Sequence, residues 1–142
     1  MSCKVIMLVE DNQDDEELAM LAFKRSRVLN EVLVARDGVE ALDYLIGPNS
    51  LEVLPQVVLL DLKLPKMDGL EVLRRLRADP RTKRLPIVVL TSSSEEEDMI
   101  ISYDLGANSF VRKPVDFSQF TEAVLQLQMY WLVLNHAPAK TT

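Results

Sequence analysis

The sequence predicts an α/β fold in which a five-stranded, doubly wound parallel sheet is covered by helices. Two observations lead to this prediction: five short apolar runs recur along the chain, and a helix-start signature follows each of them. The runs are rich in β-branched residues and apolar throughout, which is typical of strands buried on both faces. Because strands that alternate with helices form parallel sheets, we expect a (βα)₅ chain.

The five runs and the five signatures locate the elements. The expected strands are Val5–Val9, Val32–Ala35, Val57–Leu60, Ile87–Leu90 and Ser109–Val111. Each signature has Asp or Ser followed three residues later by Glu or Gln, and these side chains can bond the free backbone N–H groups of a first helical turn. The pairs are Asp14/Glu17, Asp37/Glu40, Asp68/Glu71, Ser94/Glu97 and Asp116/Gln119.

Apolar stripes and stop signals define the rest of each helix. Residues at helical spacing are expected to face the core, and in the first three helices they are Leu18, Leu21 and Ala22, then Leu42 and Leu45, then Leu70, Leu73 and Leu76. The expected stops are Gly47-Pro48, Asp79-Pro80 and Gly106.

Length and composition limit the possible functions. With 142 residues, the chain is expected to form one domain over 1–142, with a core of about 4–134 and a polar tail at 135–142. The net charge of −6 disfavours binding to nucleic acid and anionic membranes, so we expect protein partners. The sequence has no apolar stretch long enough to span a bilayer, and the start of the chain is unlike a secretion signal, so we expect a cytoplasmic location. Cys3 and His136 are the only residues of their types, which excludes a disulfide or a Cys/His zinc site within one chain.

Polar residues follow the strands in corresponding places. Glu10-Asp11, Asp61, Thr91 and Lys113 each come directly after an expected strand. Ligands of open parallel sheets bind at this edge. With the flavodoxin-like strand order 2-1-3-4-5, the first and third strands are neighbours, and the three acids converge on one crevice.

Three carboxylates in one crevice repel each other. Two unit charges ~4 Å apart interact by ~4 kcal/mol at an effective dielectric constant of ~20, so a bound cation or a proton is needed. Mg²⁺ is the natural cation because it prefers oxygen ligands and combines one or two carboxylates with phosphate oxygens.

An aspartate beside Mg²⁺ can attack phosphorus and form an acyl phosphate, and Asp61 is central among these acids. Lys113 can pair with a phosphoryl oxygen, Thr91 can donate its hydroxyl to another, and Ser92 is small enough to let the group approach. Each residue also has a purely structural interpretation, as a turn, a helix cap or an exposed lysine. The combination, in order and at the strand ends, favours the phosphoryl site.

The motifs together resemble a known family. They are Val9-Glu10-Asp11-Asn12, then Leu59-Leu60-Asp61-Leu62-Lys63-Leu64-Pro65 with Asp68-Gly69, then Val89-Leu90-Thr91-Ser92, then Gly106-Ala107-Asn108-Ser109-Phe110-Val111-Arg112-Lys113-Pro114. This set resembles the receiver domain of two-component response regulators over residues 4 to 134.

The resemblance implies a role for each matching residue. It implies Mg²⁺ bound by Asp11, Asp61 and the main-chain carbonyl of Lys63, with Glu10 assisting through water. Asp61 would be the phosphoacceptor for a histidine kinase, with Mg²⁺-dependent phosphotransfer and dephosphorylation promoted by the chain itself. It also implies that Thr91 and Phe110 are paired switch residues and that the Lys113-Pro114 peptide is cis.

Further features narrow the resemblance. Asp14-Asp15, the long segment before Pro55 and the ending Tyr130-Trp131-Leu132-Val133-Leu134-Asn135 are similar to stand-alone regulators that serve cyanobacterial phytochromes. A phytochrome-type histidine kinase is therefore the expected partner. Glu10, where many members have Asp, and Lys63 and Ser93, near the expected phosphoryl position, leave the lifetime of the acyl phosphate open.

The expected last helix is apolar nearly all round at its end. One stripe fits the core, while a second set predicts a homodimer or a kinase-docking surface, with packing under the tail as the alternative. The second set is Leu125, Met129, Tyr130, Leu132 and Val133.

Two rival functions stay open: a receiver-like adaptor that is never phosphorylated, and a phosphatase with an aspartate nucleophile. The phosphatase would want a second acid at position 63, where the chain has Lys63.

Overall fold

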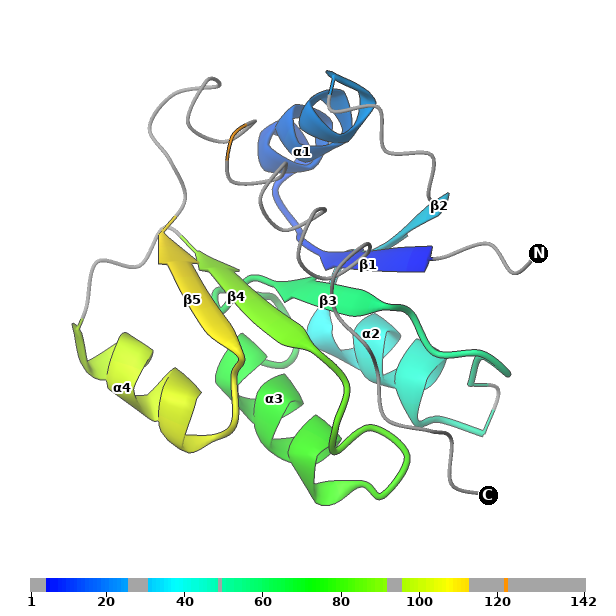
Figure 1. The fold of residues 1–142 in the computed structure, drawn as a ribbon, viewed down its shortest axis with the longest axis vertical. Helices are drawn as coiled ribbons and strands as arrows, with labels where there is room; N and C mark the ends of the chain where they lie inside the picture. Colours follow the sequence, from blue (N-terminus) through cyan, green and yellow to red (C-terminus); the bar gives the residue numbers. More distant parts are fainter. Residues whose placement is uncertain (1–4, 26–30, 49, 92–95, 113–121, 123–142) are drawn as a thin grey trace.

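The computed structural model describes residues 5–25, 31–48, 50–91, 96–112 and 122. Five parallel strands form one sheet in the order β2-β1-β3-β4-β5, as the sequence predicts (Figure 1). The strands are β1 (Val5–Val9), β2 (Glu31–Ala35), β3 (Val57–Leu60), β4 (Ile87–Thr91) and β5 (Ser109–Arg112). The α/β, doubly wound fold class is therefore confirmed.

The strand register aligns the carboxyl ends of the central strands. Val9, the last residue of β1, pairs with Ala35 of β2 on one side and with Leu60 of β3 on the other. On the far side of β3, Leu60 pairs with Val89 of β4. The residues that follow these strands are therefore brought to one edge of the sheet.

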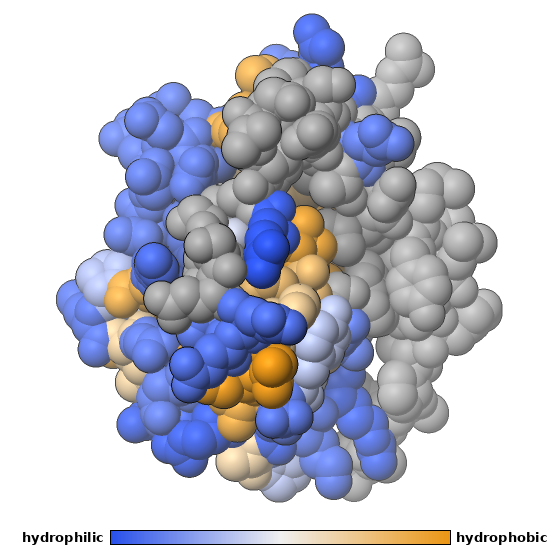
Figure 2. Space-filling view, turned by 90° about the vertical axis from the view of Figure 1, so that its left-hand side faces the viewer, coloured by the Kyte–Doolittle hydropathy of each residue, from blue (hydrophilic) through white to orange (hydrophobic). Residues whose placement is uncertain are grey.

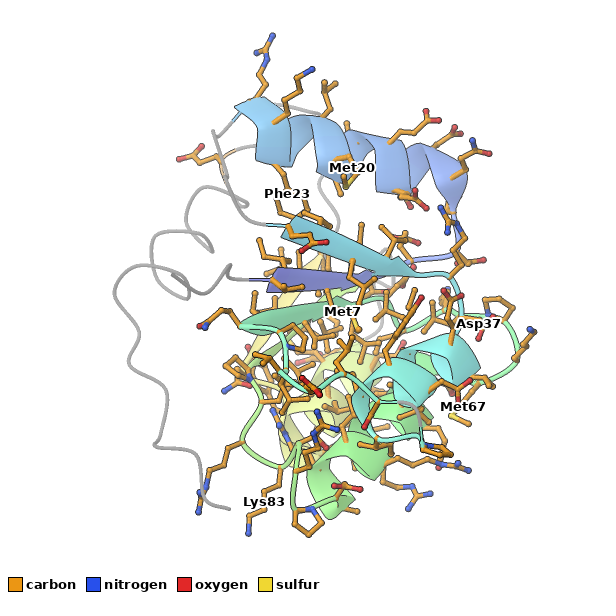
Figure 3. The ribbon with its side chains drawn as sticks, turned by 90° about the vertical axis from the view of Figure 1, so that its right-hand side faces the viewer. Met7, Met20, Phe23, Asp37, Met67 and Lys83 are labelled. Atoms are coloured by element: carbon orange, nitrogen blue, oxygen red, sulfur yellow. The ribbon has the colours of Figure 1, made fainter. Side chains whose placement is uncertain are left out.

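Helices cover both faces of the sheet, so successive side chains of each strand enter two different apolar cores. Helix α1 (Gln13–Arg25) covers one face, where Phe23 packs with Ile6 and Leu8 (Figures 1 and 3). Helices α2 (Gly38–Leu45) and α3 (Gly69–Ala78) cover the other face, where Met7 belongs to the larger core. The burial of strands on both faces explains why their sequences do not alternate.

Two of the expected N-caps are confirmed and one is wrong. Asp37 accepts a hydrogen bond from Glu40 N, and Asp68 accepts one from Leu70 N, so both cap the helices that follow. In α1 the cap is Asn12, whose Oδ1 accepts from Asp15 N at 3.0 Å, and Asp14 lies inside the first turn. Asn and Asp cap equally well, so the helix begins two residues before the expected position.

The helix ends follow the expected stop signals. Helix α3 ends before Asp79, and α4 (Glu96–Asp104) is followed by Gly106 in the left-handed conformation, at φ 97°. Leu21 of α1 is 50% exposed, so its expected place in the core is wrong; Ala19 and Phe23 are buried instead. The expected helix starts at Ser94 and Asp116 lie outside the described residues.

Among the described helices, none is both long and apolar enough to cross a membrane.

Candidate functional site

Three carboxylates meet at the carboxyl edge of the sheet. Oxygens of Glu10, Asp11 and Asp61 all lie within 4.8 Å of one another. Glu10 and Asp11 follow β1, and Asp61 follows the neighbouring β3, so the strand order alone places them side by side. The acids expected from the sequence to converge are thus brought together.

Backbone hydrogen bonds hold two of these acids in line with the sheet. Glu10 N donates to Ala35 O at 2.9 Å, and Asp61 N donates to Val9 O at 3.1 Å. The sheet ladder therefore continues one residue beyond β1 and β3, and the two carboxylates start from rigid backbone.

Neighbouring N–H groups also point at the carboxylates. Asn12 N donates to Glu10 Oε2 at 3.3 Å, and Lys63 N donates to Asp61 Oδ1 at 3.2 Å. Hydrogen bonds to the charged form of a carboxylate stabilise that form. Both acids are thus held by the segments that follow them in the chain.

The donor set and its burial fit a divalent cation. Glu10 and Asp61 are only 3% and 5% exposed, while Asp11 is exposed to solvent. Two buried carboxylates beside a third are strongly repulsive without a positive charge between them. Because every donor of the cluster is a carboxylate oxygen, a hard cation such as Mg²⁺ or Mn²⁺ is the kind of ion that it suits.

The loop between β3 and α3 passes close beneath Asp61. Gly69 N donates to Leu62 O at 2.8 Å, and a Cβ atom on Gly69 would lie 2.3 Å from Asp61 O. Glycine is therefore required at position 69 for α3 to begin this close to the site. A side chain there would displace the backbone of Asp61.

The same loop is fastened to the start of α2. Lys66 lies in the left-handed region at φ 67°, and Met67 N donates to Pro65 O across it at 2.7 Å, which forms a γ-turn. The Lys66 ammonium lies 3.4 Å from Asp37 Oδ2. Figure 3 shows Asp37 and Met67 on the same side of the molecule.

Asp37 therefore both caps α2 and pairs with Lys66 of the loop. Its hydrogen bond from the backbone of Glu40, together with the hydrogen bond and charge of Lys66, lowers the pKa of its carboxyl. The adjoining Gly38 lies against the loop, because a Cβ atom there would be 2.5 Å from Met67 O. The start of α2 thus supports the segment that carries Lys63.

A hollow of about 270 Å³ opens on the other side of this loop, toward α4. Its lining combines apolar side chains with charged ones: Leu62, Lys63, Leu64, Asp68, Leu70 and Asp98. Lys63 lines this hollow two residues after Asp61. The hollow is thus bordered by one cationic side chain, Lys63, and two acidic ones, Asp68 and Asp98.

Some of the remaining expected site residues are described by the structure and the others are not. Thr91 is fully buried as the last residue of β4, and Phe110 of β5 is partly buried against the larger core. Both lie on strands that continue the sheet beyond Asp61. Ser92, Lys113 and Pro114 lie outside the described residues, as does the expected dimer surface.

Sequence reasoning missed two residues that shape the site. Asn12 caps α1 and places its backbone N–H on Glu10, and Lys66 anchors the loop after Asp61. The signal for Asn12 was present, because Asn directly after an acidic pair is a strong capping residue. The left-handed Lys66 had no local signal, since lysine does not favour positive φ.

Comparison with known proteins gives one consistent result. Residues 6–125 match the family model for the response regulator receiver domain. The phosphorylated cyanobacterial phytochrome response regulator RcpA has a crystal structure with 41% sequence identity and a TM-score of 0.89, covering 97% of this chain and 100% of that one.

Two further relatives come from different organisms. Response regulator Rcp1 of Synechocystis is 38% identical over 96% of this chain and 94% of its own length. A crystal structure of its Mn²⁺-bound form has a TM-score of 0.84 and covers 96% of this chain and 99% of that one. The probable methanogenesis regulatory protein FilR2 of Methanothrix harundinacea is 40% identical over 94% of this chain and 87% of its own length.

Proposed function

Because this chain belongs to the response regulator receiver family of two-component signalling, we propose that it accepts a phosphoryl group on Asp61 from a histidine kinase. The observation that supports the proposal most is the cluster of Glu10, Asp11 and Asp61, in which Asp61 directly follows the central strand and is nearly buried. The similarity to phosphorylated RcpA supports it as well.

We assign the metal site to the same cluster. Asp11, Asp61 and the main-chain carbonyl of Lys63 would bind Mg²⁺, and Glu10 would assist through water. When bound, the ion neutralises the carboxylates and the developing charge on the phosphoryl oxygens. The Mn²⁺-bound structure of Rcp1 supports a divalent ion at a site of this family.

The transfer itself needs few protein groups. An oxygen of the Asp61 carboxylate forms a bond to phosphorus as the bond between phosphorus and the kinase imidazole nitrogen breaks. The electron pair of that bond stays on the nitrogen, and the product is an acyl phosphate. Thr91, Ser92 and Lys113 would bind the phosphoryl oxygens, with Lys113 balancing their charge.

Phosphorylation adds about −1.5 to −2 charges and three strong acceptor oxygens next to Thr91. Thr91 would move toward these oxygens and the Phe110 ring would turn inward to fill the space that it leaves. The surface of α4 and β5 would change with it, together with the expected last helix. The chain is thus a signalling protein, which would also promote its own Mg²⁺-dependent dephosphorylation.

The partner that we propose is a phytochrome-type kinase. RcpA is named as a phytochrome response regulator, and its match over 97% of this chain supports that pairing. FilR2, a relative of similar identity, is named as a probable methanogenesis regulatory protein, so the proposed pairing with a phytochrome-type kinase rests on RcpA. The homodimer and the cytoplasmic location expected from the sequence stay predictions.

The experiment that tests this function is intact-mass measurement of the purified chain with Mg²⁺ and acetyl phosphate. One added phosphoryl group is expected in the parent chain and none in Asp61→Asn. Chelation of the Mg²⁺ should abolish the gain in the parent, because the clustered carboxylates then repel the incoming phosphoryl group.

A matched acidic control is Asp43→Asn on α2, which should gain mass as the parent does. A gain in Asp61→Asn equal to that of the parent would contradict Asp61 as the phosphoacceptor. No gain in the parent, with the chain folded and Mg²⁺ present, would favour the adaptor that acts through protein contacts alone.

A further inference from the structure

Helix α4 is held to the protein by little apolar burial. Of its nine residues only Ser102 is fully buried, and the Ser102 hydroxyl donates to Asp98 O of the same helix. Ile100 and Tyr103 are 53% and 49% exposed. Polar contacts therefore contribute a larger share of the interactions that hold α4 in place than they do for a helix with a buried apolar stripe.

One such contact joins α4 to the expected switch residue. Phe110 N donates to the Tyr103 hydroxyl at 3.2 Å. Phe110 lies on β5, which is the edge strand of the described sheet and has α4 beside it (Figure 1). The Tyr103 oxygen thus occupies a position on this edge where a further strand would otherwise supply an acceptor.

The turn that follows Tyr103 at the carboxyl end of α4 is fixed separately. Arg77 of α3 donates from Nε to Gly106 O at 2.9 Å and from Nη2 to Asn108 Oδ1, also at 2.9 Å. Asn108 Oδ1 accepts in addition from Ile87 N of β4. The turn after α4 is therefore tied to α3 and β4, and movement of α4 would pivot about this end.

Figure 2 faces the side of the molecule that carries α4 and β5, and it shows an apolar area there among hydrophilic residues. On that side Tyr103 combines a half-exposed ring with a hydroxyl bound to the strand beneath.

We propose that Tyr103 is the positioning residue that couples the state of Phe110 to helix α4, through a hydrogen bond that is made without phosphorylation and released with it. This rests on the proposed function of Asp61. The inward turn of the Phe110 ring changes the surface beside α4, so that the helix shifts and its Tyr103 oxygen moves away from the Phe110 backbone N–H. Helix α4 then loses its polar link to β5 and pivots at the end held by Arg77.

The test is hydrogen–deuterium exchange read at the Phe110 amide by NMR in the parent chain and in Tyr103→Phe. Without a phosphoryl donor, loss of the acceptor should speed exchange at Phe110 by about threefold to tenfold, the range expected for one hydrogen bond. With Mg²⁺ and acetyl phosphate, the parent should speed up similarly while Tyr103→Phe shows little further change.

Tyr44→Phe removes a hydroxyl from α2 and serves as the matched control. It should leave exchange at Phe110 as in the parent, with and without the donor. A purely structural Tyr103 would alter the unphosphorylated chain but would leave the response to acetyl phosphate intact, and that result would overturn the coupling.

Intact mass on the same samples separates the two proposals. A gain of one phosphoryl group with unchanged exchange at Phe110 in the parent would overturn the role of Tyr103 alone. No gain in mass in the parent would overturn both, because the release of the hydrogen bond would then have no trigger.

Discussion

Helices α3 and α4 lie in the same layer of the molecule, yet they are held in different ways. Helix α3 buries Val72, Leu73 and Leu76 completely and begins at the capping Asp68. Helix α4 has no comparable apolar face in contact with the core. Apolar burial therefore fixes α3, which begins in the loop after Asp61, much more firmly than α4.

The largest expected effect tests burial directly. Leu73→Ala should lower the free energy of unfolding by about 2–5 kcal/mol, because it leaves a cavity in the core. Ile100→Ala in α4 should change it by less than about 0.5 kcal/mol, since that side chain is half exposed. Urea denaturation followed by circular dichroism measures both, and similar losses would remove the contrast between the helices.

The next prediction concerns the hydrogen bonds that join α3 to the turn after α4. Arg77 donates to Gly106 O and the side chain of Asn108, and burial lowers the pKa of its guanidinium. Arg77→Met should destabilise the fold by about 1.5–3 kcal/mol, because the partly buried oxygens Gly106 O and Thr82 O lose a charged donor. The control Arg75→Met removes a cation that lies on the surface beside Glu71, and it should be much milder in the same denaturation experiment.

A smaller effect is expected at the cap of α3. Asp68→Ala removes the acceptor for Leu70 N and should lower the free energy of unfolding by about 1 kcal/mol. Asp68→Asn keeps an acceptor in the same place and should restore most of the loss. If thermal unfolding shows Asn and Ala to be equally destabilising, the cap contributes through its charge and not through this hydrogen bond.

The smallest effect is the pH dependence at α2. The pKa of Asp37 is lowered in the folded chain, so its contribution is present at neutral pH and is lost as the pH falls from 3.8 through the folded value. Asp37→Asn keeps a capping oxygen but loses the charge beside Lys66. It should be less stable than the parent at pH 7 by about 0.2–1 kcal/mol, with the difference vanishing in acid.

Denaturation midpoints of both chains between pH 2 and pH 7 would check this prediction. A constant difference across that range would mean that the interaction between Asp37 and Lys66 does not depend on the carboxylate charge.

The fold could be predicted from sequence because its signals are local. Strands buried on both faces are apolar without alternation, and caps such as Asp37 and Asp68 precede their helices directly. The convergence of Asp11 and Asp61 followed from the strand order, since residues after neighbouring parallel strands meet at one edge.

The parts that sequence did not predict depend on contacts between distant segments or on choices between equal residues. The left-handed Lys66 is set by packing of its loop against α2, and the exposure of Leu21 depends on how α1 rolls onto the sheet. Asn12 and Asp14 cap helices equally well, so the pattern alone could not choose between them.

Asp61 as the phosphoacceptor is tested most directly by identifying the residue that carries the phosphoryl group. The chain is treated with Mg²⁺ and acetyl phosphate, reduced with borohydride, which converts an aspartyl phosphate to homoserine, and then mapped by peptide mass spectrometry. We predict homoserine at position 61 and at no other acid, and none when Mg²⁺ is chelated. Modification at Asp11, or equal labelling without a divalent ion, would contradict it.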